Sequence, residues 1–278
     1  LLAFLHQRNQ AVAAMLQPAL LQGPATLERA AALALARAAG PQAERLVLEY
    51  LPLTFSRRHG DPSRPWNKFS IRVRDSAGRR VVNYEGNWRD IFQNWEALLP
   101  SQPAYATSMV AAFLGAMTPD GYNPYRISRA GIDWEQPEAD NPWSHIGYWG
   151  DHQVVYLLRL LEALQDQQPG QMAHLWDRAL FSFADVPYRL RPHDQQTAQP
   201  KSTITFDADA NQRAQARAAR LGSDGLLVVD GTGMPVLATL AEKLAIILLA
   251  KAGSLVPGGG LWLHTQRPEW NDANNALV

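Results

Sequence analysis

The sequence has 278 residues, enough for one large domain or two small ones with a substantial buried core. Lysine plus arginine equals aspartate plus glutamate, at 26 each, so no bulk charge attracts nucleic acid or an anionic membrane. There is no cysteine, which excludes disulfide frameworks, thiolate metal sites and cysteine nucleophiles.

The sequence shows no segment that predicts a membrane span or a signal peptide. The longest apolar segment, 235–252, contains Glu242 and Lys243 and is too short to cross a bilayer comfortably. The first 21 residues carry His6 and Arg8 where a signal peptide needs an apolar run. We therefore expect no membrane partner and a cytoplasmic protein.

The first fifty residues predict helices. Apolar residues recur at spacings of three and four over 2–21, 26–38 and 41–51, and Gly-Pro pairs at 23–24 and 40–41 separate these segments. Thr26 to Glu28 suits a helix cap, and the helices are expected to pack or link, with no chemistry of their own. We treat 1–52 as an N-terminal helical segment.

The next stretch predicts a β-hairpin inserted among helices. Residues 69–74 alternate apolar and polar, 75–78 form a turn signal, and 79–84 return as a second strand.

Helical patterns then dominate the rest of the chain. The segment 118–142 reads as a long loop whose aromatic residues indicate function, since loops of this length in compact domains are usually functional or disordered. The segment 185–206 reads as a second loop, and 226–229 as either a strand or the start of a helix. The expected helices are 90–99, 103–117, 151–165, 171–183, 208–221 and 235–251, the last apolar on most faces and therefore expected to be buried.

One pattern, Trp-x-Asp, occurs three times, each time after a loop and where a helix begins or should begin. The tryptophans are separated by 61 residues (88 to 149) and by 121 residues (149 to 270), close to one and two units of about sixty. Helix pairs repeated at this spacing can close into a ring of six hairpins. The inner helices of such a ring would present their N-terminal ends on one face, where carboxylates are stabilised as anions.

Side chains around the three motifs suit a carbohydrate. Tryptophan faces stack on pyranose rings, and carboxylates and amides bind vicinal hydroxyls. Cleaving a glycosidic bond further needs a carboxylic acid to protonate the leaving oxygen, with water or phosphate as the nucleophile. The candidates are Trp88, Arg89, Asp90, Trp149, Asp151, His152, Gln153, Trp270, Asn271 and Asp272.

A structural interpretation stands beside the chemical one. Aspartate at a helix start is most often an N-cap, and a nearby tryptophan is most often part of the core. For a single motif this is the simpler interpretation. Three copies near a common spacing, each rich in Arg, His, Gln or Asn, leave both interpretations open.

Two of these motifs resemble a family. The stretch 86–94, Gly-Asn-Trp-Arg-Asp-Ile-Phe-Gln-Asn, is similar to the Gly-Phe-Arg-Asp-x-x-Gln-Asp stretch of cellobiose-phosphorylase-type enzymes, which belong to the six-hairpin (α/α)6 glycosidase superfamily. The stretch 269–272, Glu-Trp-Asn-Asp, looks like the family's Asp-Trp-Asn-Asp motif. The resemblance implies that Asp272 is the general acid, that Glu269 and Trp270 line the site, and that Arg89 and Asp90 hold the sugar on the non-reducing side.

The chain also departs from the family. Glu269 replaces the family's first Asp, Asn94 replaces the Asp after Gln, and Ala273 replaces the usual Gly. The family's phosphate-binding groups lie downstream of the Trp-Asn-Asp motif, beyond Val278. The resemblance therefore does not distinguish phosphorolysis from hydrolysis.

We therefore expect a mainly α fold, an incomplete (α/α)6 six-hairpin toroid with an inserted β-hairpin, in which 53–278 are part of a catalytic domain truncated at its C-terminal end. The expected function is cleavage of glycosidic bonds in oligosaccharides with inversion, with Asp272 as acid and Asp151 or Glu135 as candidate base. No cofactor is expected other than inorganic phosphate as co-substrate. The expected partners are the oligosaccharide and the remainder of the same polypeptide. The alternatives are a non-catalytic carbohydrate-binding or scaffold module and a purely structural helical repeat.

Overall fold

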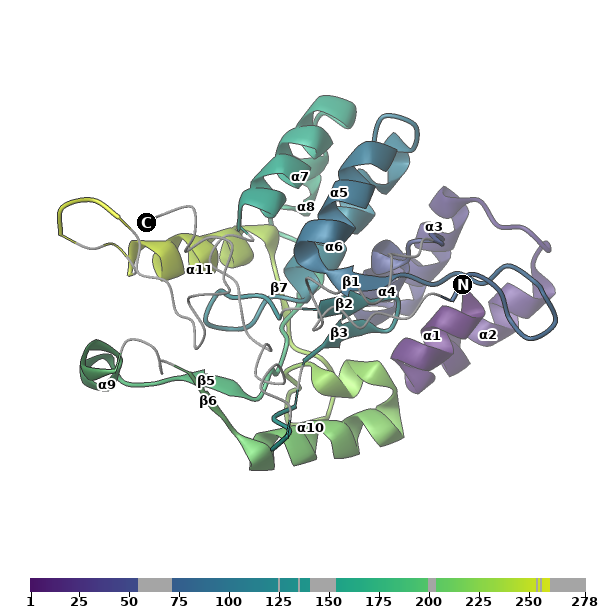
Figure 1. Cartoon of the computed structure of the whole chain (residues 1–278). Helices are drawn as coiled ribbons and strands as arrows, with labels where there is room; N and C mark the ends of the chain where they lie inside the picture. Colours follow the sequence, from purple (N-terminus) through teal and green to yellow (C-terminus); the bar gives the residue numbers. More distant parts are fainter. Residues whose placement is uncertain are drawn as a thin grey trace.

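The protein is mainly helical, as the sequence predicts, with three small sheets among its described residues (Figure 1). The structure is a computed structural model that describes residues 1–54, 72–124, 126–134, 136–140, 154–199, 204–253, 255 and 257–260. The α-helices are α1 (Leu2–Arg8), α2 (Gln10–Gln22), α3 (Arg29–Ala39), α4 (Pro41–Glu49), α5 (Trp88–Leu98), α6 (Ala106–Gly115), α7 (Val154–Gln167), α8 (Gln171–Leu175), α9 (His193–Ala198), α10 (Ala208–Leu221) and α11 (Leu240–Ala252). The strands are β1 (Glu85–Asn87), β2 (Arg126–Ser128), β3 (Gly131–Asp133), β4 (Phe181–Ser182), β5 (Tyr188–Leu190), β6 (Ile204–Phe206) and β7 (Leu237–Ala238), and two short 3-10 helices are η1 (Pro103–Tyr105) and η2 (Ser223–Leu226).

The N-terminal segment differs from its prediction at two points. The expected helix 2–21 is divided into α1 and α2 because Asn9 is extended (φ −154°, ψ 107°), and its side chain accepts the Val12 amide at 3.2 Å. This hydrogen bond caps α2. The cap expected within Thr26 to Glu28 is confirmed in position, because Glu28 is the N-cap residue of α3, but its side chain forms no capping hydrogen bond. Helices α1 to α4 share a hydrophobic cluster of their own.

The turn of the predicted hairpin is present, but its ladder is short. The Gly78 amide donates to the Asp75 carbonyl at 3.0 Å, and the Asp75 carboxylate accepts the Ala77 amide at 2.9 Å. Beyond the turn, the described residues pair through one isolated bridge, Arg74 with Arg80. Residues 69–71 of the predicted first strand lie outside the described part of the chain.

The segment 118–142, predicted as a loop, contains two strands. Strands β1, β2 and β3 form an antiparallel sheet in that order, with Gly86 opposite Ile127 and Ile127 opposite Ile132. Each strand has three residues, too few for a period of two to be recognised. Trp134, which follows β3, is buried, so at least this aromatic residue serves the core.

Two further predictions are wrong because short strands pair with distant residues. The helix predicted at 171–183 ends at Leu175, and the chain then forms β4, which pairs with β7 (Phe181 opposite Ala238). The loop predicted at 185–206 holds β5 and β6, which pair antiparallel on either side of α9.

Helix α6 lies at the centre of the main hydrophobic cluster. All ten of its residues are buried. The start of α5 contacts the end of α6, where the Trp88 and Phe113 rings lie 4.7 Å apart. The start of α6 contacts the end of α7, where Thr107 donates to Gln168 at 2.9 Å. Both α5 and α7 therefore run antiparallel to α6.

The C-terminal helices are confirmed in part. Helix α10 has its predicted bounds and begins with a capping bond from the Ala210 amide to Asp207 at 2.9 Å. Helix α11 begins at Leu240 and not near Pro235, because Thr239 and Glu242 form a reciprocal capping box. The prediction that this helix is buried is wrong: Leu248 and Leu249 are 70% and 72% exposed.

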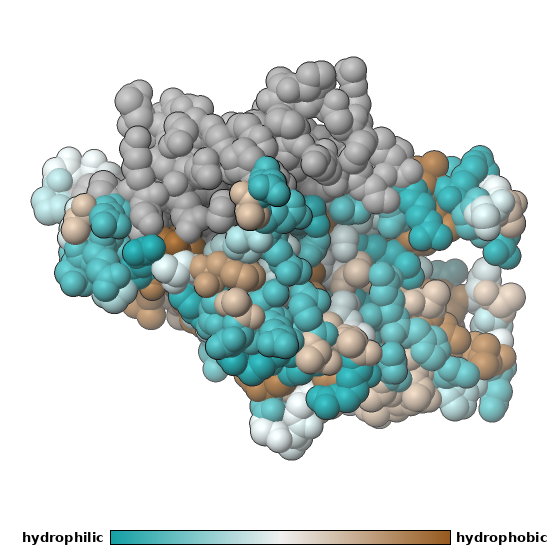
Figure 2. Space-filling view, turned by 60° about the horizontal axis from the view of Figure 1, so that its bottom comes forward, coloured by the Kyte–Doolittle hydropathy of each residue, from teal (hydrophilic) through white to brown (hydrophobic). Residues whose placement is uncertain are grey.

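On the coloured part of the face seen in Figure 2, hydrophilic residues predominate and hydrophobic ones are interspersed among them. Across the described ranges, none of the helices combines the length and the apolar character that a membrane crossing requires.

The orientation of α11 makes a testable prediction from two adjacent residues. Ile247 is buried, whereas Leu248 points to solvent. We expect Ile247→Ala to lower the free energy of unfolding by about 2–5 kcal/mol, because it removes buried methyl groups and leaves a cavity. We expect Leu248→Ala, the matched control, to change it by about 0.5 kcal/mol or less. Urea denaturation measures both, and equal losses would contradict the observed orientation.

Candidate functional site

The first Trp-x-Asp motif lies where strand β1 passes directly into α5. Asn87 ends the strand and Trp88 is the first residue of the helix, two residues before the predicted start. The backbone of Arg89 and Asp90 forms the first helical turn. Their side chains lie outside the described part of the structure. The helix start itself confirms that this motif opens a helix.

Trp88 belongs to the core. Its side chain is 1% exposed, and its ring meets the Trp95 ring edge-on at 6.1 Å and 81°. The indole N–H groups of Trp88 and Trp95 have no hydrogen-bond partner among the described residues. Such a buried indole presents no open face to a sugar. Stacking of Trp88 on a pyranose ring stays a prediction, and the burial of the Trp88 indole does not support it.

Helices α5 and α7 lie side by side and run in the same direction (Figure 1). Near their N-terminal ends, the rings of Phe92 and Tyr156 stack at 4.9 Å and 18°. Further along both helices, Glu96 and Arg159 form an ion pair at 3.3 Å. Because residue numbers increase together along both helices, their N-terminal ends lie at the same end of the pair.

The two helix starts stand differently to their motifs in the sequence. The first motif is the first turn of α5, whereas Asp151 of the second motif precedes Val154, the first residue of α7, by three residues. The other predicted site residues lie outside the described residues: Glu135, Trp149, Asp151, His152, Gln153, Glu269, Trp270, Asn271 and Asp272.

A buried ionic cluster, which the sequence did not predict, joins the N-terminal helices to η2. Arg8 of α1 contacts Glu49 of α4 at 2.7 Å and Asp224 of η2 at 3.3 Å. Arg45 of α4 contacts the same two carboxylates, Glu49 at 3.3 Å and Asp224 at shorter range. Asn9 donates to Asp224 at 3.0 Å. Only the spacing of Arg45 and Glu49, four residues apart on one helix, is visible in the sequence.

The cluster favours the charged forms of Asp224 and Arg8. Burial favours the neutral form of Asp224, but Arg45 and Arg8 outweigh it and hold the pKa of Asp224 below its ordinary value. Burial likewise disfavours the charged form of Arg8, but Glu49 and Asp224 raise the pKa of Arg8 above its ordinary value. Two guanidinium groups and two carboxylates thus balance one another in the interior.

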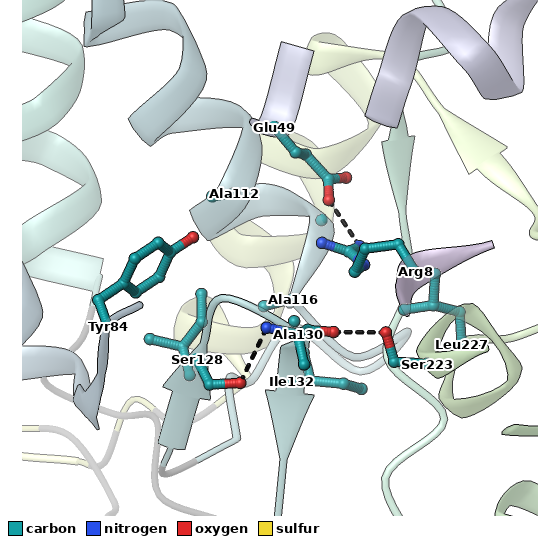
Figure 3. A pocket seen from close by; sticks show the side chains of 13 residues that line it. Arg8, Glu49, Tyr84, Ala112, Ala116, Ser128, Ala130, Ile132, Ser223 and Leu227 are labelled. Atoms are coloured by element: carbon teal, nitrogen blue, oxygen red, sulfur yellow. Dashed lines mark hydrogen bonds and ion pairs between the residues drawn. The ribbon is translucent and has the colours of Figure 1, made fainter. Parts of the chain in front are cut away.

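The cavity beside this cluster is too small for a substrate. Arg8 and Glu49 face Tyr84, Ser128 and Ser223 across it, and Ser223 donates to the Ala130 carbonyl (Figure 3). The cavity has a volume of about 20 Å³, which leaves room for about one water molecule. We conclude that the cluster fastens α1, α4 and η2 together.

Lys243 of α11 is a further buried charge-bearing group. Its ammonium group donates to the Ser182 carbonyl and lies 3.3 Å from the centre of the Phe183 ring. Burial lowers the pKa of Lys243 well below its ordinary value, and Glu49 opposes this only in part. Among the described residues, no group of three or more His, Cys, Asp and Glu is arranged to hold a metal ion.

Comparison of the sequence with models of known protein families and with curated proteins found no match.

The ionic cluster predicts how stability depends on pH. The pKa of Asp224 is lowered by folding, so its stabilising effect is complete above its ordinary value of 3.8 and is lost as the pH falls through the folded value. Asp224→Asn leaves the buried Arg8 and Arg45 to share one carboxylate, Glu49, and should cost about 3–5 kcal/mol near pH 7. Urea denaturation between pH 7 and pH 3 should show this difference shrinking at the acid end. A constant difference would contradict the assignment, and the exposed Asp177→Asn is the control.

Proposed function

We propose that this protein cleaves glycosidic bonds of oligosaccharides, with Asp272 as the general acid. The observation that supports this is the parallel packing of α5 and α7, because the first Trp-x-Asp motif forms the first turn of α5 and the second, at 149–151, lies in the sequence just before the start of α7. Parallel neighbours present their N-terminal amides and positive dipole ends at one end of the pair. Carboxylates brought there are stabilised as anions and can bind sugar hydroxyls.

The fold proposed for the whole domain is a ring of helical hairpins. Helices α5 and α6 form one antiparallel pair, and α7 returns parallel to α5. This alternation is what an (α/α)6 toroid requires of consecutive hairpins. The toroid is part of the proposal, with residues beyond α11 supplying the third motif.

The proposed chemistry needs one acid and one nucleophile. Asp272 in its protonated form gives its proton to the glycosidic oxygen as the bond to the anomeric carbon breaks. Water, activated by a second carboxylate such as Asp151, or phosphate attacks the anomeric carbon from the opposite face, which inverts its configuration. In an inverting hydrolase the two carboxyl groups stand about 6.5–9.5 Å apart. Arg89, Asp90, His152, Gln153 and the tryptophans would hold the sugar.

The burial of Trp88 favours a second candidate function. If the first motif serves the core alone, the protein is a non-catalytic carbohydrate-binding or scaffold module. The proposal also includes an oligosaccharide as partner, inorganic phosphate as co-substrate and a cytoplasmic location.

The acid is tested by Asp272→Asn in the full polypeptide. An amide cannot donate a proton to the leaving oxygen, so we expect the cleavage rate to fall by about 10²–10⁴-fold. Disaccharides with α and β linkages would be incubated with and without phosphate, and free sugar and sugar phosphate quantified. Asp209→Asn, on the exposed side of α10, is the control.

The products separate the alternatives. Sugar phosphate that forms only with phosphate establishes phosphorolysis, and free sugar without phosphate establishes hydrolysis. Full activity of Asp272→Asn would refute the assigned acid. Saturable sugar binding by both proteins, with no product, would support the binding module.

A further inference from the structure

A second pocket, lined by arginines, lies near the start of α6 and the end of α7. This is the end of the helix group opposite to the starts of α5 and α7. The pocket is bounded by α3 and α4, by Thr107 at the start of α6 and by Gln168 at the end of α7. The Trp88 contact with Phe113 is at the other end of α6. The pocket, of about 350 Å³, is therefore distinct from the proposed glycosidic site and falls in the size range of small-molecule sites.

The pocket carries an excess of positive charge. Its guanidinium groups come from Arg29, Arg37 and Arg178, and its carboxylate from Glu44, so three positive charges face one negative charge. Glu44 accepts Arg37 at 3.0 Å and Arg178 at 2.6 and 2.5 Å. One carboxylate shared by two arginines leaves the whole pocket with two uncompensated positive charges.

Arg29 is the least compensated of the three. It is partly buried, donates to the Ser108 hydroxyl at 3.0 Å and lies 5.5 Å from the centre of the Tyr105 ring. Within the described part of the chain it forms no ion pair with a carboxylate. Burial lowers its pKa, with Tyr105 opposing this in part, so the site disfavours the charge that Arg29 carries. An anion bound in the pocket would favour the charged form of Arg29 and raise its pKa again.

His174 supplies a neutral donor beside the arginines. Its Nε2 lies 3.1 Å from a guanidinium nitrogen of Arg178. Arginine only donates hydrogen bonds, so Nε2 must accept, and the ring proton is on Nδ1. The side chain of Gln171 adds amide donors and an acceptor to the lining.

We propose that this pocket binds a phosphoryl group, either as inorganic phosphate or as the phosphate of a small ester such as a sugar phosphate. A phosphate monoester carries about −1.5 to −2 charge at pH 7, which matches the excess of two positive charges. Guanidinium groups bind phosphate oxygens through paired N–H donors. The volume left beyond the phosphate admits an attached group, which Gln171 can bind.

The test is titration calorimetry with two probes, inorganic phosphate and glucose 6-phosphate, at an ionic strength held constant with chloride. We expect Arg29→Gln and Arg37→Gln each to raise the Kd by about tenfold or more, since each removes a charge-assisted contact. Arg29 pairs with no carboxylate of the described residues and Arg37 is 55% exposed, so neither change should unfold the protein. Arg213→Gln, on the exposed face of α10, is the matched control and should bind normally.

The titrations distinguish the two ligands and can overturn the proposal. Tighter binding of glucose 6-phosphate than of phosphate would support the proposal with an ester as ligand, and equal binding would support it with phosphate itself. No heat above that of chloride in the unchanged protein would overturn it. Equal Kd values for all variants would also overturn it, by placing the bound phosphate elsewhere.

Discussion

The complete burial of α6 is the constraint on which the rest of the structure depends. None of its ten residues faces water, so the helix must be covered on every side. Helices α4, α5 and α7 and strand β4 provide this cover. Because α5 and α7 both pack antiparallel to α6, they are parallel to each other. The packing of one apolar helix thereby sets the N-terminal ends of α5 and α7 at the same end.

The N-terminal helices depend on a different interaction. Most of their apolar residues form a cluster of their own, and the ionic cluster around Asp224 joins them to the body of the protein beside the packing of α4 on α6. A buried carboxylate between two arginines tolerates no loss of a partner, because the remaining charge stays in the interior. This connection also holds one wall of the arginine pocket, since Glu44 and Arg45 are neighbours on α4.

The structural elements that were predicted correctly are those that a local sequence pattern determines. Helix α10 and the helix starting at the first motif were found because their apolar spacing and start signals are local. Strands β2 to β7 were missed because two or three residues leave no periodic pattern, whether the partner is near in sequence, as for β2 and β3, or distant, as for β4 and β7. The exposed face of α11 and the partners of Asp224 depend on tertiary packing alone. Of the predicted site residues, only Trp88 has a described side chain, and it lies in the core.

The claim that α5 and α7 begin at the same end of the pair is tested most directly by two distances between these helices. The chain has no cysteine, so spin labels can be placed at chosen positions without background. One label at Gln93→Cys would be combined with a second at Val155→Cys or at Asp166→Cys, two positions about 16 Å apart along α7. Parallel helices predict that the Gln93–Val155 distance, measured by double electron–electron resonance, is clearly the shorter. A shorter Gln93–Asp166 distance would contradict the observed packing of α5 against α7, on which the shared end of the two helix starts depends.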